Sequence, residues 1–133
     1  MSAGKYLTLE EAQKLVPEVR RRILKIMKLN AAIGLISEIE ISYYDELEAA
    51  FSEIRFNKKF HSLCLRLFTE LEALVKRGAV LDDIEMGTVN FYSICSGKPV
   101  VLCWSIGDRH IKYWREVDED FSERKPISRL RQS

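Results

Sequence analysis

Cysteine and histidine are scarce in this sequence. The 133 residues include three cysteines and two histidines, and no two cysteines form a Cys-x-x-Cys pair. An odd number of cysteines without paired spacing excludes a disulfide framework and favours a reducing compartment. The N-terminal segment MSAGKYLTLEEAQ lacks the apolar core of a secretory signal. We therefore expect a cytoplasmic protein.

Long apolar runs and an excess of one charge are also missing. Apolar residues make up 47% and charged residues 31% of the chain, which is the composition of an ordinary globular protein. No apolar run is long enough to cross a membrane, so no membrane partner is expected. The formal net charge is +1, from 21 basic and 20 acidic residues. This balance argues against a dedicated nucleic-acid binder.

Motifs that carry enzyme chemistry are missing as well. The sequence contains no glycine-rich phosphate loop, no Ser-His-Asp order and no paired-carboxylate motif. No nucleophile has an identifiable base. The sequence therefore favours a protein that is not an enzyme, with no catalytic residue, no metal and no cofactor.

Two long helical patterns occupy the first half of the chain. Thr8 and Glu11 have the spacing of a capping box, which predicts a helix that starts near Leu9. Pro17 removes one backbone hydrogen bond and predicts a kink, or a short helix that restarts there. Apolar residues then recur at three- and four-residue steps, namely Val16, Val19, Ile23, Ile26 and Ile33.

The second helical pattern runs from about Asp45 to Lys76, after a predicted break at 42–45. Lys76, Arg77 and Gly78 have the chemistry of a helix end, with cations at the negative pole and a glycine that can turn left-handed. Its apolar positions are Leu47, Phe51, Ile54, Phe60, Leu63, Leu67, Leu71 and Leu74. Two helices of matched length joined by a short break predict an antiparallel hairpin over residues 8–77.

After Gly78 the apolar period falls from 3.6 towards 2, which predicts strands. We expect strands at 88–92, 100–106 and 110–116, with turns at 95–98 and at Gly107–Asp108. Short strands need a layer to cover one face, and the hairpin is the available layer. The predicted fold is α+β, a long antiparallel helical hairpin followed by a three-stranded antiparallel β-meander.

The chain contains no internal repeat and no linker, so one domain over residues 1–133 is expected. Its parts are the hairpin at 8–77, the meander at 79–117 and a polar tail at 118–133. The end of this tail is basic, with Arg124, Lys125, Arg129 and Arg131 and no acid after Glu123. We expect the tail to be loosely held.

Two stretches of the chain carry a recognisable series of residues. The first is Leu7–Ala12 followed by Leu15–Glu18. The second contains Gly87–Phe91, Gly97, Leu102–Trp104, Gly107–Asp108, Ile111, Tyr113–Trp114 and Phe121. Together these stretches resemble the prokaryotic family known as domain of unknown function 2203. The family pattern has Glu and His where this chain has Asp108 and Arg115. The resemblance spans nearly the whole chain and implies no activity, since the family is uncharacterised.

His61 and Cys64 lie three positions apart on a predicted helix and therefore share a face. Cys95, Cys103 and His110 could approach them in the fold. A structural zinc site needs about four such ligands, and nothing in the spacing brings these residues together. We interpret the cysteines as buried and inert, since free cysteine is among the most often buried residues.

A candidate ligand site lies among aromatic and charged residues of the predicted meander. Its residues are Trp104, Asp108, Tyr113, Trp114, Arg115 and Arg124, with Arg109 and Glu116 nearby. Guanidinium groups beside an aromatic wall could bind a small anion or a peptide terminus. The competing interpretation is sheet core for Trp104 and surface ion pairs for the charged residues.

The second helix carries more apolar surface than one partner helix and a small sheet can cover. Phe51, Phe56, Phe60, Phe68 and the leucines occupy more than one stripe. A hairpin of this kind pairs with another to make a four-helix arrangement. We predict a self-associating interaction module that forms a homodimer through its helices. The alternatives are a small-ligand or catalytic site near Trp104, Asp108 and Arg115, and RNA binding through the 20–28 face and the tail.

Overall fold

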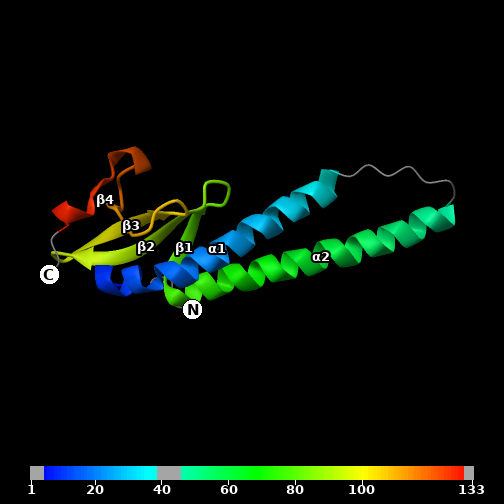
Figure 1. Ribbon diagram of the computed structural model, residues 1–133, viewed down its shortest axis with the longest axis horizontal. Coiled ribbons are helices and arrows are strands. Elements are labelled where there is room, and N and C mark those ends of the chain that lie inside the picture. Colours follow the sequence, from blue (N-terminus) through cyan, green and yellow to red (C-terminus); the bar gives the residue numbers. More distant parts are fainter. Residues whose placement is uncertain (1–4, 39–45, 131–133) are drawn as a thin grey trace.

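The computed structural model describes residues 5–38 and 46–130 as two long helices followed by a five-stranded antiparallel sheet (Figure 1). This confirms the predicted α+β class, with a helical hairpin before an antiparallel meander. The helices are α1 (Leu9–Glu38) and α2 (Glu46–Arg77). The strands are β1 (Ala79–Asp83), β2 (Thr88–Cys95), β3 (Lys98–Ser105), β4 (Tyr113–Glu116) and β5 (Lys125–Pro126).

Helix α1 starts with the capping box that the sequence predicts. The Thr8 amide donates to Glu11 Oε1 at 2.9 Å, and the Glu11 amide donates to Thr8 Oγ1 at 3.1 Å. These hydrogen bonds lower the pKa of the Glu11 carboxyl. The helix continues through Pro17 without a break, so the predicted restart does not occur. The break predicted at 42–45 lies outside the described residues.

The core lies between α1, the C-terminal end of α2 and one face of the sheet. In α1 the buried residues follow the predicted three- and four-residue steps. Across from them, Phe91 of β2 and Trp104 of β3 are among the largest fully buried side chains. The core residues from the helices are Ala12, Val16, Val19, Ile23, Ile26 and Leu74. Trp104 therefore lies in the core, which was one of the two interpretations that the sequence allowed for it.

Helix α2 ends as predicted at Gly78, whose φ is 92°. The Gly78 amide donates to Val75 O at 3.0 Å, and a Cβ at this glycine would meet Leu7 Cδ1 at 3.0 Å. A left-handed turn of this kind reverses the chain directly into β1. It therefore places the whole sheet beside the N-terminal half of α1.

The sheet contains two more strands than the three predicted, and its strand order is β1-β2-β3-β4-β5. The two added strands, β1 and β5, are the edge strands of the sheet. β1 pairs with β2 through a register irregularity between Leu81 and Asp83, and the two-residue β5 contains Pro126. Irregular and proline-containing segments give weak sequence signals for strands, because both are confined to edges.

Observed strand bounds also differ from the predicted ones. β2 extends to Cys95 rather than residue 92, β3 runs from Lys98 to Ser105, and β4 begins at Tyr113 rather than residue 110. β2 and β3 continue to the predicted turn, where Cys95 pairs with Lys98. The two turn residues, Ser96 and Gly97, have φ values of 52° and 77°. Two successive positive φ values are typical of a type I′ hairpin.

The segment predicted to be a loosely held tail packs on the sheet over residues 118–130. β5 pairs with β4, with Tyr113 opposite Pro126 and Trp114 opposite Lys125. Two single turns of 3-10 helix, Phe121–Glu123 and Ile127–Arg129, flank β5. Polar composition alone did not indicate this, because its ordering depends on contacts with β4.

The helical hairpin extends well beyond the sheet (Figure 1). Among the described residues, the last buried side chain of α1 is Ile26 and the first of α2 is Leu63. Beyond these positions, the described part of the hairpin therefore contains no buried side chain. No helix among the described residues is both long enough and apolar enough to span a membrane.

Candidate functional site

The six residues predicted to bind a ligand lie on both faces of the sheet. Leu102 pairs with Trp114 and Cys103 pairs with Tyr113, so Trp114 shares a face with the core residue Leu102. Tyr113 and Arg115 lie on the opposite face, because side chains alternate along a strand. The structure therefore divides the predicted site into two groups. A ligand-binding role for these residues stays a prediction.

The first group surrounds the turn after β3. Trp104 is 1% exposed, and its Nε1 donates to the Asp108 carbonyl at 3.0 Å. Arg20 of α1 lies over the Trp104 ring at 5.4 Å and donates to the carbonyls of Ile106 at 3.0 Å and Asp108 at 2.6 Å. The Asp108 carboxylate faces Lys112 at 3.8 Å. The contacts of Arg20 hold this turn against α1.

A second set of hydrogen bonds from α1 holds the segment between β3 and β4. Gln13 Nε2 donates to the Ile111 carbonyl at 3.1 Å, and the Ile111 amide donates to Gln13 Oε1 at 2.9 Å. Sequence reasoning assigned no role to Gln13 and placed Arg20 only on the basic face of the helix. Their partners lie 98 and 86 to 88 positions away, so no local pattern indicates them.

A shallow groove of about 490 Å³ lies beside the pinned turn. It is lined by Val16, Pro17, Arg20, Gly107 and Arg109. Two guanidinium groups on a partly apolar floor are chemically suited to a small anion. The Arg20 guanidinium donates to two carbonyls, whereas Arg109 makes no hydrogen bond or ion pair among the described residues and keeps all its donors for a ligand.

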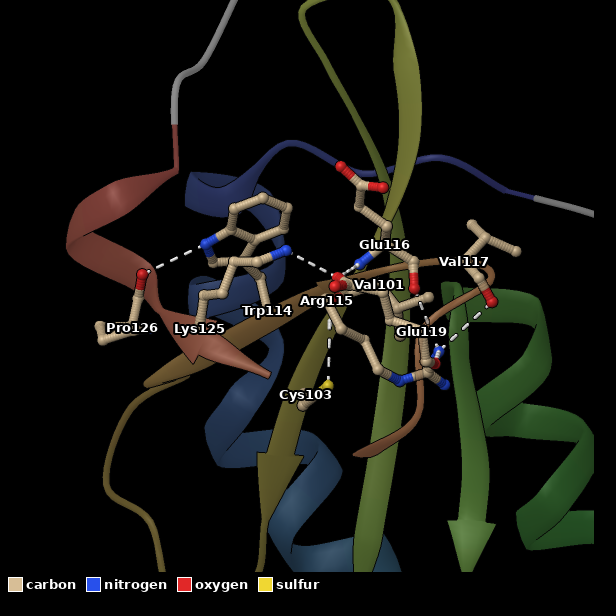
Figure 2. A network of polar contacts seen from close by, with 9 residues as sticks. All are labelled: Val101, Cys103, Trp114, Arg115, Glu116, Val117, Glu119, Lys125 and Pro126. Atoms are coloured by element: carbon tan, nitrogen blue, oxygen red, sulfur yellow. Dashed lines mark hydrogen bonds and ion pairs between the residues drawn. The ribbon is translucent and has the colours of Figure 1, made fainter. Parts of the chain in front are cut away.

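The second group holds the C-terminal segment on the outer face of the sheet (Figure 2). Arg115 Nη1 donates to the Glu119 carbonyl at 2.8 Å and, at longer range, to the Glu116 carbonyl at 3.3 Å and the Val117 carbonyl at 3.5 Å. Arg124 lies 4.3 Å from the Tyr113 ring centre and 4.1 Å from that of Phe121. Both guanidinium groups therefore contact their own chain.

An ion pair fastens the same segment (Figure 2). Lys125 Nζ lies 2.7 Å from Glu119 Oε1 and 4.7 Å from the centre of the Trp114 ring. The hydrogen bond from Lys125 and one from the Glu116 amide lower the pKa of the Glu119 carboxyl. Trp114 Nε1 donates to the Pro126 carbonyl at 3.2 Å. These contacts explain why residues 118–126 are ordered.

Cys103 is 3% exposed and lies beneath this outer cluster. Burial raises the pKa of its thiol, and the neighbouring Arg115 guanidinium offsets part of that rise. A buried thiol that stays protonated is a weak nucleophile. In the described residues, no three His, Cys, Asp or Glu side chains gather closely enough to hold a metal ion. His61, Cys64, Cys95, Cys103 and His110 therefore do not form such a group.

The basic face of α1, which the RNA-binding alternative invokes, is partly neutralised within the chain. Arg22 Nη1 lies 2.9 Å from Glu70 Oε1, and Lys25 Nζ lies 3.8 Å from Glu70 Oε2. Arg77 of α2 also forms an ion pair with Glu18 of α1. These contacts join α1 to α2 and reduce the positive charge available to a polyanion.

A row of large apolar side chains on α2 stays exposed in the part of the chain that the structure describes. Six apolar side chains on this helix are 52% to 68% exposed: Leu47, Phe51, Ile54, Leu65, Phe68 and Val75. We call these six residues the α2 stripe. They lie opposite the face that contributes Leu63 and Leu74 to the interior. Large exposed apolar surfaces of this kind mark sites of association.

A groove of about 510 Å³ borders the α2 stripe, between the two helices. It is lined by Lys25, Lys28, Leu29, Leu65, Arg66, Thr69 and Glu70. Leu65 belongs both to this groove and to the stripe, so the apolar surface continues from α2 towards α1. At Leu65 the α2 stripe therefore meets a groove whose far side belongs to α1.

Comparisons with known proteins give a family and no function. No curated protein and no solved structure matches the chain. The family described as uncharacterized conserved protein DUF2203 matches residues 5–127, which is nearly the whole sequence. The chain belongs to this family.

Proposed function

We propose that this protein is a single-domain, cytoplasmic interaction module without enzymatic activity, and that it forms a homodimer through its helices. The single observation that carries the proposal is the α2 stripe, whose six side chains are 52% to 68% exposed in one chain. Burying such surface is the main favourable term in protein association. Isolated exposed apolar residues are common, but six along one helix face are not.

The far half of the hairpin supports the same proposal. Beyond Ile26 and before Leu63, no side chain among the described residues is buried in a single chain. Helices in water draw most of their stability from packing of an apolar face, so two long helices with little packing need a partner. A second hairpin supplies that packing in a four-helix arrangement.

Light scattering during size-exclusion chromatography tests the proposal. At micromolar concentration we expect a mass twice the 15.5 kDa of one chain. Phe51→Glu places a charge in the α2 stripe and is expected to return the mass to that of one chain. Met86→Glu is the matched control, because Met86 is 66% exposed on the β1–β2 turn, outside the stripe. A monomer mass for the unsubstituted protein contradicts the proposal.

A small-ligand site at the turn after β3 is the second candidate function. It is supported by the 490 Å³ groove with Arg20 and Arg109 on its rim, beside Trp104 and Asp108. Native mass spectrometry of purified protein tests this candidate. A bound small molecule whose mass is lost on Arg109→Ala supports it, and protein that carries no adduct contradicts it.

RNA binding is the third function considered, and nucleic acid is the partner that the charges favour least. Glu70 of α2 forms ion pairs with Arg22 and Lys25 and so neutralises part of the basic face of α1. Fluorescence anisotropy with labelled RNA tests this function, because phosphate contacts weaken steeply as salt rises. No salt-dependent binding is expected.

A further inference from the structure

We infer that two copies pair through the α2 stripe in an antiparallel register, with Phe51 against Phe68 of the second copy and Ile54 against Leu65 of the second copy. This inference rests on the proposed self-association and specifies its geometry. It starts from the spacing of the α2 stripe and from the polar residues that interrupt it.

The α2 stripe has the spacing of a coiled-coil seam. Positions 47, 51, 54, 58, 61, 65, 68, 72 and 75 alternate steps of four and three residues, which is the a/d pattern of a heptad repeat. Lys58, His61 and Glu72 occupy the seam positions between the apolar ones. These three polar residues select the direction of pairing.

A parallel, in-register pair is disfavoured by charge. It would place Lys58 against Lys58 of the second copy in the seam, partly removed from water. Glu72 would also meet Glu72, and each of these carboxylates is paired with Lys76 of its own chain at 2.9 Å. Like charges at such short range repel, and the repulsion grows as water is excluded. Polar residues at seam positions specify orientation in this way.

An antiparallel pair removes both like-charge contacts, because no two lysines and no two glutamates of the seam then meet. With the two-fold axis midway between positions 58 and 61, Lys58 meets His61 and Leu47 meets Glu72. Phe51 then meets Phe68 and Ile54 meets Leu65, and the symmetry repeats each contact. Aromatic pairs contribute beyond their buried area. The helix dipoles also oppose each other in this arrangement.

Charges at the edge of the stripe complement each other in the same register. Glu48 and Lys76 directly follow Leu47 and Val75, so both lie on the same edge of the stripe. A two-fold axis brings that edge of one copy against the same edge of the other. Helical side chains lean towards their own N-terminus, so Glu48 of one copy and Lys76 of the other lean towards each other. Lys76 lies 2.9 Å from Glu72 of its own chain, so Glu48 of the second copy is the second carboxylate that it meets.

The register also covers the part of the hairpin that lacks packing. The helices overlap from position 47 to position 72, roughly 39 Å at about 1.5 Å per residue. Residues 47–61 of each copy then lie on residues 58–72 of the other, close to its sheet. The α2 helix of each copy therefore packs against the part of its partner's α2 that has little packing within one chain.

Disulfide formation between engineered cysteines tests the register. In a Cys64→Ser background, one chain carries Ile54→Cys and a co-expressed chain carries Leu65→Cys. We expect a disulfide-linked heterodimer on a non-reducing gel. Neither chain is expected to crosslink with itself, because its two copies of the cysteine lie about 16 Å apart along the axis, whereas a disulfide needs Cα atoms within about 7 Å.

Each outcome of this experiment separates the register from the self-association. Self-crosslinking of either single variant means parallel pairing, which overturns the register but not the dimer. No crosslink in the mixture, with the dimer mass retained, also overturns the register. A monomer mass for the unsubstituted protein overturns both.

A charge exchange provides a second measurement that leaves the apolar seam intact. Glu48→Lys is expected to weaken the dimer by about threefold to tenfold, since a surface ion pair contributes little and occurs twice here. Adding Lys76→Glu to that variant is expected to restore the affinity. Failure of the second substitution to restore it contradicts the register.

Discussion

Replacing Phe68 with alanine is the most direct quantitative test of the apolar surface on α2. Phe68 is 66% exposed in one chain. A fully enclosed phenylalanine buries roughly 200 Å², so a partner that covers the exposed part removes roughly 130 Å² from water. At about 25 cal/mol per Å² this corresponds to about 3 kcal/mol, of which the alanine methyl retains roughly a third.

The loss is therefore about 2 kcal/mol for each side chain, and the two-fold symmetry doubles it. A total of about 4 kcal/mol weakens the dimer about a thousandfold. Sedimentation velocity over a dilution series measures this dissociation constant. Unfolding of the dilute monomer should change by less than about 0.5 kcal/mol, because the side chain is exposed there.

Met86→Ala is the matched control, because Met86 has the same 66% exposure but lies on the β1–β2 turn. It should leave the dissociation constant unchanged. A change of less than tenfold for Phe68→Ala, or an equal change for the control, would refute the reasoning.

Three further predictions concern the sheet and its contacts. Arg20→Ala removes two charge-assisted hydrogen bonds to the turn after β3 and should lower the free energy of unfolding in urea by about 2 kcal/mol, whereas Arg21→Ala on the exposed face should not. The pKa of Glu119 lies below its ordinary 4.5, so its ion pair with the C-terminal segment is complete above pH 4.5 and is lost as the pH falls through the lowered pKa. The indole N–H resonance of Trp114 should report that loss, and Glu119→Gln should show the loosened state at neutral pH. In native protein, a thiol reagent should modify Cys64 much faster than the buried Cys103, and equal rates would contradict the burial.

The helical half of the fold was predictable because its signals are local. The capping box at Thr8, the core spacing from Val16 to Ile26 and the left-handed Gly78 each act within a few residues of the chain. The core of the meander was predictable for the same reason, since alternation along β2 and β3 sets which side chains meet α1. Pro17 was expected to kink α1 or to restart it, and the helix continues through Pro17 without a restart.

The candidate site was only partly predictable. Its residues were named from the second half of the chain, and the structure places Trp104 with Asp108 but moves Tyr113 and Arg124 to the opposite face. The side chains that hold the turn after β3 and the segment that follows it come from α1. They are Arg20 and Gln13. A single polar residue has no sequence pattern that points to a partner so far along the chain.

The sequence by itself determined the α+β class, the ends of the helix pair and the surplus of apolar residues on the second helix, because periodicity and capping act over a few residues. Only the tertiary structure decided which of those apolar residues stay exposed, since burial depends on what packs against each face. It also decided that residues 118–130 pack on the sheet, because β5 is ordered by β4 and by the Glu119–Lys125 pair rather than by its own composition.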